Sequence, residues 1–92
     1  MTIREPKNIP TKDSQEDIRS ENFLILHNDD VHTFDYVIDA LIEICEHQYE
    51  QAAQCTILVH YKGKCDVKKG SFAALKPMKD ALIERELNAT ID

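Results

Sequence analysis

The chain has few glycines, few aromatic residues and no long apolar run. Two glycines among 92 residues leave no glycine-rich loop that could cradle phosphate groups. No apolar stretch approaches the roughly 20 residues of a membrane span, and the first residues lack the hydrophobic block of a signal peptide. These absences exclude a phosphate-binding loop and predict a cytoplasmic protein that does not interact with a membrane.

Cysteine is also scarce, with Cys45, Cys55 and Cys65 at wide spacing and no C-x-x-C pair. This spacing argues against a zinc or redox motif, so we interpret the three cysteines as small, reduced, buried residues. Cys55 and His60 are five residues apart, which does not align two side chains on a helix for nucleophilic catalysis. The sequence therefore predicts no enzyme activity and no cofactor.

Basic residues are outnumbered, with 11 Lys and Arg against 17 Asp and Glu and a net charge of -6. Nucleic-acid binding normally requires a dense basic face, so a nucleic-acid partner is not expected. A cationic partner fits this charge better. The apolar share of 42% suffices for one small core, and we expect a single domain.

The pattern of residues divides the chain into a tail and a domain. Residues 1–21 carry Pro6, Pro10 and mixed charges without an apolar face, which predicts a flexible N-terminal tail. Residues 22–92 form the predicted domain. It begins with a buried strand over 23–27, followed by a helix from Phe34 for which Thr33 or a preceding aspartate provides the N-cap.

The remaining elements follow the same reasoning. A second helix is predicted over 50–61 with Gly63 as its C-cap, then a short strand over 64–67 and a turn over 68–70. Ser71 caps a third helix that Pro77 kinks or splits, and 87–92 alternate as a final strand. The expected fold is α+β, an α/β sandwich of order β-α-α-β-α-β. Its small three-stranded, mainly antiparallel sheet carries three helices on one face.

Asn28, Asp29 and Asp30 stand where the first strand ends, and Val59-His60 lies on the second helix. The amide oxygen, the carboxylates and a neutral imidazole are all hydrogen-bond acceptors. Together they could surround a group with several N–H donors, such as a free α-ammonium group. A carboxylate from either aspartate would add charge assistance, directly or through water.

Apolar residues are expected beside these acceptors. Phe34 and Val37 share one helix face, as do Thr56 and Val59, because each pair is three residues apart. They could line an apolar pocket. A ligand that is charged at one end and bulky at the other fits this combination, which describes an N-terminal Leu, Phe, Tyr or Trp.

These segments resemble the ClpS family, adaptors of the bacterial Clp protease that bind a protein's free α-amino group and its first side chain. The family pattern has an apolar strand, N-D-D, then T-P-M-E-F-V, and later M-x-x-V-H-x-x-G. The corresponding segments here are Leu26–Val37 and Thr56–Gly63, and the resemblance extends over about residues 22–92. It implies delivery of substrate N-termini to a Clp-family AAA+ ATPase, ClpA-like or ClpC-like, that engages the tail.

The resemblance also assigns roles to individual residues. It implies that Asn28, Asp29 and His60 contact the α-amino group. The implied side-chain pocket is formed by Leu26, His32, Phe34, Val37, Thr56, Val59 and Leu87.

Several positions depart from the family pattern, and two of them change the pocket. Phe34 replaces a gate Met with a stiffer, larger side chain, and Thr56 replaces a second Met with a smaller, more polar one. Thr33 replaces the family's Pro, and His32 stands where Thr is common. The accepted set of first residues can therefore differ from that of other members.

Two other interpretations remain open from the residues alone. Asp29, Asp30, His32 and His60 could form a metal site, since carboxylate and imidazole are ligands of zinc, manganese and iron. The domain could also be a protein-interaction module similar to the C-terminal domain of the ribosomal stalk protein, which recognises no N-terminal residue.

Overall fold

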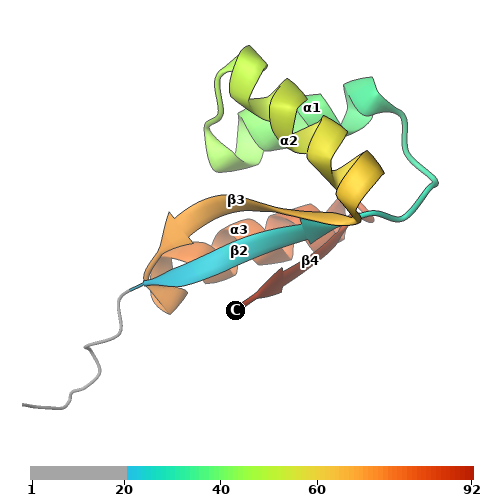
Figure 1. Cartoon of the computed structure of the whole chain (residues 1–92). Coiled ribbons are helices and arrows are strands. Elements are labelled where there is room, and N and C mark those ends of the chain that lie inside the picture. Colours follow the sequence, from blue (N-terminus) through green and yellow to red (C-terminus); the bar gives the residue numbers. More distant parts are fainter. Residues whose placement is uncertain (1–20) are drawn as a thin grey trace, which may run out of the picture.

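The computed structural model describes residues 21–92, which form one α+β unit (Figure 1). Its elements are β2 (Asn22–His27), α1 (Phe34–Cys45), α2 (Tyr49–Lys62), β3 (Lys64–Gly70), α3 (Phe72–Glu84) and β4 (Asn88–Ile91). The predicted order β-α-α-β-α-β is confirmed. The predicted tail, residues 1–21, lies outside the described residues except for Glu21.

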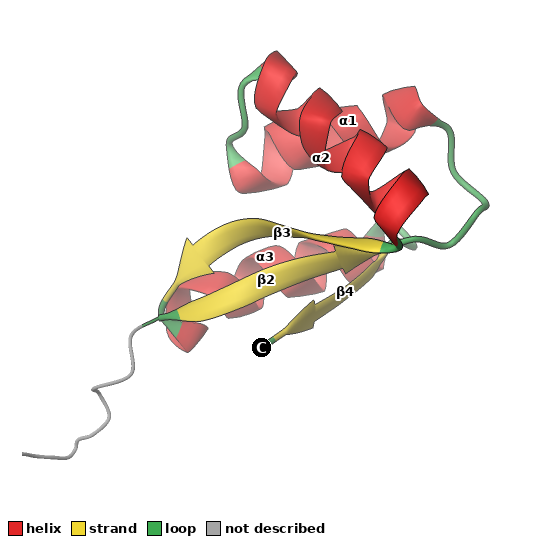
Figure 2. Cartoon of the chain, in the orientation of Figure 1, coloured by secondary structure: helices red, strands yellow, loops and turns green. Residues whose placement is uncertain are grey.

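The sheet is antiparallel throughout, in the order β3-β2-β4 (Figure 2). The central strand β2 is rich in Leu and Ile, which suits a strand with a neighbour on each side. Its pairing with β3 shifts at one point, because Leu24 pairs with Lys68 while Ile25 pairs with Asp66. This shift is a β-bulge at Val67, which is buried.

The helices cover one face of this sheet and enclose the core. Leu24 and Leu26 alternate along β2 and belong to the core cluster, whereas Ile25 between them does not. From the helices, the core receives fully buried Leu41, Leu75 and Leu82. Alternation along the central strand therefore directs Leu24 and Leu26 to the helix side.

Helix α1 begins where the sequence predicted. The Oγ1 atom of Thr33 accepts a hydrogen bond from the Tyr36 N–H at 3.1 Å, which makes Thr33 the N-cap. At the other end the chain turns at Glu46, which has a positive φ of 61°. The following His47 is buried, and its Nε2 atom lies 2.6 Å from the carbonyl oxygen of Val67. This hydrogen bond ties the α1–α2 connection to β3.

Two predicted elements differ from the structure. The segment 68–70 is not a turn, since β3 continues to Gly70 and all three of these residues pair with β2. Pairing with a central strand outweighs the low strand propensity of Lys and Gly. Helix α3 is not split either, because one helix runs through Pro77 from the Ser71 cap to Glu84. No helix among residues 21–92 is both long and apolar enough to cross a membrane.

Candidate functional site

The turn that follows β2 is tied to the end of α2. Gly63 ends α2 with a φ of 92°, a left-handed conformation that glycine adopts without the steric cost of a Cβ. Its carbonyl oxygen accepts a hydrogen bond from the Asn28 N–H at 2.9 Å. This bond places Asn28, at the end of β2, next to the last turn of α2, which carries His60. Two segments that are distant in the sequence therefore meet at one point.

Asn28 is oriented by its neighbour Asp30. The Nδ2 group of Asn28 donates to Asp30 Oδ1 at 2.9 Å, and the Asp30 N–H donates to Asn28 Oδ1 at 3.3 Å. Asp30 itself has a positive φ of 60°, which aspartate tolerates better than most residues. The Nδ2 group of Asn28 is thus engaged by the Asp30 carboxylate, and Asn28 Oδ1 accepts one long hydrogen bond from the Asp30 N–H. That oxygen has capacity for a further donor.

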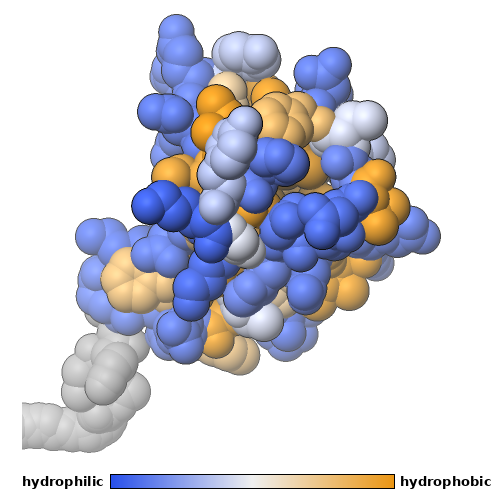
Figure 3. All heavy atoms as spheres, turned by 45° about the vertical axis from the view of Figure 1, so that its right-hand side comes forward, coloured by the Kyte–Doolittle hydropathy of each residue, from blue (hydrophilic) through white to orange (hydrophobic). Residues whose placement is uncertain are grey.

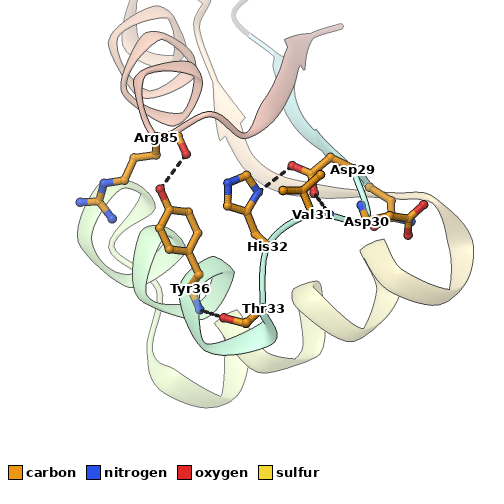
Figure 4. A network of polar contacts seen from close by, with 8 residues as sticks. Asp29, Asp30, Val31, His32, Thr33, Tyr36 and Arg85 are labelled. Carbon is orange, nitrogen blue, oxygen red and sulfur yellow. Dashed lines mark hydrogen bonds and ion pairs between the residues drawn. The ribbon is translucent and has the colours of Figure 1, made fainter.

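Asp29 is held by two local hydrogen bonds. Its Oδ1 accepts from the Val31 N–H at 3.0 Å, and its Oδ2 lies 2.9 Å from His32 Nδ1 (Figure 4). Burial raises the pKa of the Asp29 carboxyl, but the hydrogen bond from Val31 and the hydrogen bond and charge of His32 outweigh it. The pKa lies below its ordinary value of 3.8. Asp29 is therefore ionised at neutral pH.

His60 lines the same pocket as these acidic residues and is exposed. Its ring contacts Phe34 edge-on, with centroids 5.3 Å apart and planes at 68°, and it contacts Tyr61 at 4.8 Å. Neither nitrogen of His60 forms a hydrogen bond with a residue in the described part of the chain. The imidazole is thus held by aromatic contacts while its polar atoms stay available.

These side chains border a pocket of about 180 Å³ between the β2–α1 loop, α1, α2 and the α3–β4 connection. Thr56 is buried in its wall, and its hydroxyl donates to the Ala52 carbonyl oxygen at 2.8 Å. The pocket is lined by all ten residues that sequence reasoning assigned to a ligand site: Leu26, Asn28, Asp29, His32, Phe34, Val37, Thr56, Val59, His60 and Leu87. The structure brings these ten residues together around one pocket, and their contacts with a ligand are proposed below.

Sequence reasoning left some neighbours of the pocket without a role. His27 lines it and had no assigned role, whereas Thr33 was expected only as the N-cap and Asp30 only as an alternative charged acceptor. Their adjacency in the chain to predicted site residues was the available signal. The contact between the Tyr36 hydroxyl and the Arg85 carbonyl oxygen, at 2.7 Å, joins residues 49 positions apart. No periodicity of the sequence indicates that contact.

The metal-site interpretation finds no support in the described residues. Within the range 21–92, no three or more His, Cys, Asp or Glu side chains are arranged to hold a metal ion. The carboxylate of Asp29 is instead occupied by Val31 and His32.

The comparison with protein families decides the identity of the domain. The model of the ATP-dependent Clp protease adaptor protein ClpS matches residues 19–90. The chain belongs to the ClpS family. A solved structure, Agrobacterium tumefaciens ClpS2 bound to L-phenylalaninamide, has the same fold with a TM-score of 0.67. It is 18% identical in sequence, and the match covers 79% of this chain and 95% of that one.

Membership of the ClpS family agrees with the fold and with the residue pattern on which the resemblance was based. The family consists of adaptor proteins of a protease, so its members serve another enzyme. The predicted α+β fold, with three helices on one face of an antiparallel sheet, is confirmed.

Proposed function

We propose that this protein is an adaptor that binds the free N-terminal residue of substrate proteins when that residue is bulky and hydrophobic or aromatic. It then delivers those proteins to a Clp-family AAA+ ATPase, ClpA-like or ClpC-like, for degradation. The observation that carries the proposal is one pocket whose lining combines hydrogen-bond acceptors with apolar side chains. We assign the acceptors Asn28, Asp29 and His60 to one end of the ligand site and the apolar side chains to the other.

The acceptor end suits an α-ammonium group. Such a group carries three N–H donors and a positive charge, so its burial requires acceptors on several sides. Asn28 Oδ1 and a ring nitrogen of His60 have free acceptor capacity, and the ionised Asp29 supplies charge, directly or through other groups. A hydrogen bond to a charged group contributes about 1.5 to 3 kcal/mol. This end therefore selects for a free amino terminus.

The apolar end suits one side chain. A pocket of about 180 Å³ is smaller than the roughly 300 Å³ at which pockets for drug-sized molecules begin. Leu26, Val37, Val59 and Leu87 are buried or nearly so and form its walls. Burying a Leu or Phe side chain there would contribute roughly 1.5 to 3 kcal/mol. The L-phenylalaninamide bound by the A. tumefaciens protein combines a free amine with such a side chain, which supports this assignment.

The experiment that tests the proposal compares free and acetylated ligands. Peptides that start with Leu, Phe, Tyr, Trp or Ile are titrated against the protein, each with a free and an N-acetylated amino terminus. Acetylation removes the charge and two donors of the terminus. We expect binding by free peptides with bulky first residues only, and loss of that binding in Asn28→Ala. Asn88→Ala is the matched control, since Asn88 is exposed and outside the pocket. Equal binding of free and acetylated peptides would refute the proposal.

Delivery is tested separately. With a ClpA-like or ClpC-like ATPase and its peptidase, the protein should accelerate degradation of a reporter that starts with Phe, and it should have no peptidase or ATPase activity alone. We propose that the tail, residues 1–21, engages the ATPase and that the protein acts in the cytoplasm. Degradation at the same rate with and without the protein would contradict the delivery role. No observation favours the ribosomal-stalk-like alternative over this function.

A further inference from the structure

The two ring nitrogens of His32 are in different surroundings. Nδ1 lies 2.9 Å from Asp29 Oδ2, and the His32 side chain is only 13% exposed. Nε2 forms no hydrogen bond with any residue in the described range 21–92. An ionised carboxylate only accepts hydrogen bonds, so the nitrogen that faces it must donate. The neutral ring therefore carries its hydrogen on Nδ1. Nε2 is then an acceptor on a ring that lines the pocket.

The ring of His32 is fixed in place by α1 and the end of α3. It stacks on Tyr36 with centroids 4.5 Å apart and planes at 17°, and the Tyr36 hydroxyl donates to the Arg85 carbonyl oxygen at 2.7 Å. Figure 4 shows His32 between Tyr36 and the Asp29 side chain. Rotation of the imidazole would break the stack and the Asp29 hydrogen bond together. The direction of Nε2 is therefore set before any ligand arrives.

Part of the acceptor capacity of Asp29 is already used within the loop. Each of its carboxylate oxygens already has a partner, Val31 N–H for Oδ1 and His32 for Oδ2. The ionised Asp29 also favours the Nδ1–H tautomer of His32 and makes Nε2 a better acceptor. Its charge can thus act on the pocket through the imidazole.

We propose that His32 Nε2 accepts a hydrogen bond from the amino terminus of the ligand, with Asp29 as the positioning residue that orients the ring. The inference rests on the proposed function and deepens it. The site then has two imidazole acceptors, His32 on the β2–α1 loop and His60 on α2. The other titratable side chains that line the pocket are His27, Asp29 and Asp30, and Tyr36 and Arg85 adjoin His32 from α1 and the end of α3.

Two substitutions of His32 separate this role from a merely structural one. His32→Asn places an amide near the position of Nδ1, so it keeps the partner of Asp29 and removes the acceptor in the pocket. His32→Gln places an amide near Nε2, so it keeps an acceptor and loses the Asp29 bond. With a Phe-starting peptide at pH 7.5, we expect the His32→Asn variant to bind about tenfold or more weakly than the wild type. The Gln variant should stay within about threefold of the wild type. The reverse order would show a structural role and overturn the inference.

The pH dependence supplies a second readout. Histidine changes charge between about pH 5 and 8, and a protonated imidazole cannot accept from an ammonium group. With two such acceptors, the logarithm of the affinity should fall below neutral pH with a slope above about one per pH unit. The slope should drop to about one or less in His32→Gln. An unchanged slope in that variant would contradict the proposal.

The outcome is readable even where one variant misfolds. If circular dichroism shows that the His32 variants do not fold, the pH dependence of the affinity is measured in His60→Gln instead. That variant should retain a slope near one because the His32 acceptor remains, and a slope near zero would overturn the inference. Failure of the wild type to prefer free over acetylated peptides would refute the proposed function and this inference with it. A wild type that passes that test while His32→Asn binds normally refutes this inference alone.

Discussion

Substituting Phe34 by Ala should weaken the binding of bulky N-terminal residues by a predictable amount. Phe34 is 43% exposed at the first position of α1, where its ring contacts His60 edge-on at 5.3 Å. Covering that remaining surface with a ligand side chain corresponds to about two fifths of the 1.5 to 3 kcal/mol for full burial of Phe. The result is roughly 0.6 to 1.3 kcal/mol, or about a threefold to tenfold change in affinity.

The assay is fluorescence anisotropy with labelled peptides that start with Phe, Leu or Ala. Phe34→Ala should lose this factor for Phe and Leu but much less for Ala, whose methyl group does not reach the ring. Phe34→Leu preserves most of the apolar surface and should stay within about twofold. Phe72→Ala is the matched control, since Phe72 is 55% exposed on α3 and does not line the pocket. Equal effects of the two alanine substitutions, or an equal loss for all three peptides, would refute the reasoning.

Three further predictions concern stability and reactivity. Asp29 has a lowered pKa in the folded state, so its ionisation stabilises the fold above about pH 3.8, and this contribution is lost as pH falls through the folded pKa. Asp29→Asn should thus lower the free energy of unfolding at pH 7 and reduce the decline of that free energy in acid. Urea unfolding of the wild type and the variant at pH 7 and pH 3 measures both effects. An equal decline in the two proteins would contradict this prediction. Leu41 is fully buried, so Leu41→Ala should lower the free energy of unfolding by about 2 to 5 kcal/mol. Ile83 is 47% exposed, so Ile83→Ala should lower it by under about 1 kcal/mol. Equal losses would show that the core is misplaced. Burial raises the pKa of the Cys45 thiol to about 11, against a smaller opposite effect of Lys68, and burial and a hydrogen bond with Cys55 raise that of Cys65 to about 12. Both thiols should therefore react with iodoacetamide far more slowly at pH 8 in the folded protein than in urea, and equal rates would argue against these raised pKa values.

The parts of the fold that depend on local chemistry could be predicted from the sequence. The Thr33 cap, the apolar spacing of α1 and the Gly63 cap each require only neighbouring residues. The extension of β3 over 68–70 could not be predicted, because Lys68 and Lys69 have weak strand preference and become a strand by pairing with β2. Tertiary contacts therefore determine the secondary structure of that segment.

The candidate site shows the same division. Its composition followed from the position of Asn28 at a strand end and of His60 on a helix, together with a family pattern. Figure 3 shows apolar surface over α1 and α2 among hydrophilic atoms, and exposed Phe34, Ile57 and Leu58 belong to these helices. The hydrogen bonds of Asp29 and the contact between Tyr36 and Arg85 were not visible in the sequence. They depend on loop geometry and on a contact between distant elements.

The most direct test of the central claim is a crystal structure of this protein with a peptide that starts with a free Phe. The account predicts that the α-ammonium group lies within hydrogen-bond distance of Asn28 Oδ1 and a ring nitrogen of His60. The Phe ring should lie between Val37, Thr56, Val59 and Leu87, with the later residues of the peptide leaving the pocket. A Phe ring bound outside this pocket, or an amino terminus that points to solvent, would contradict the account.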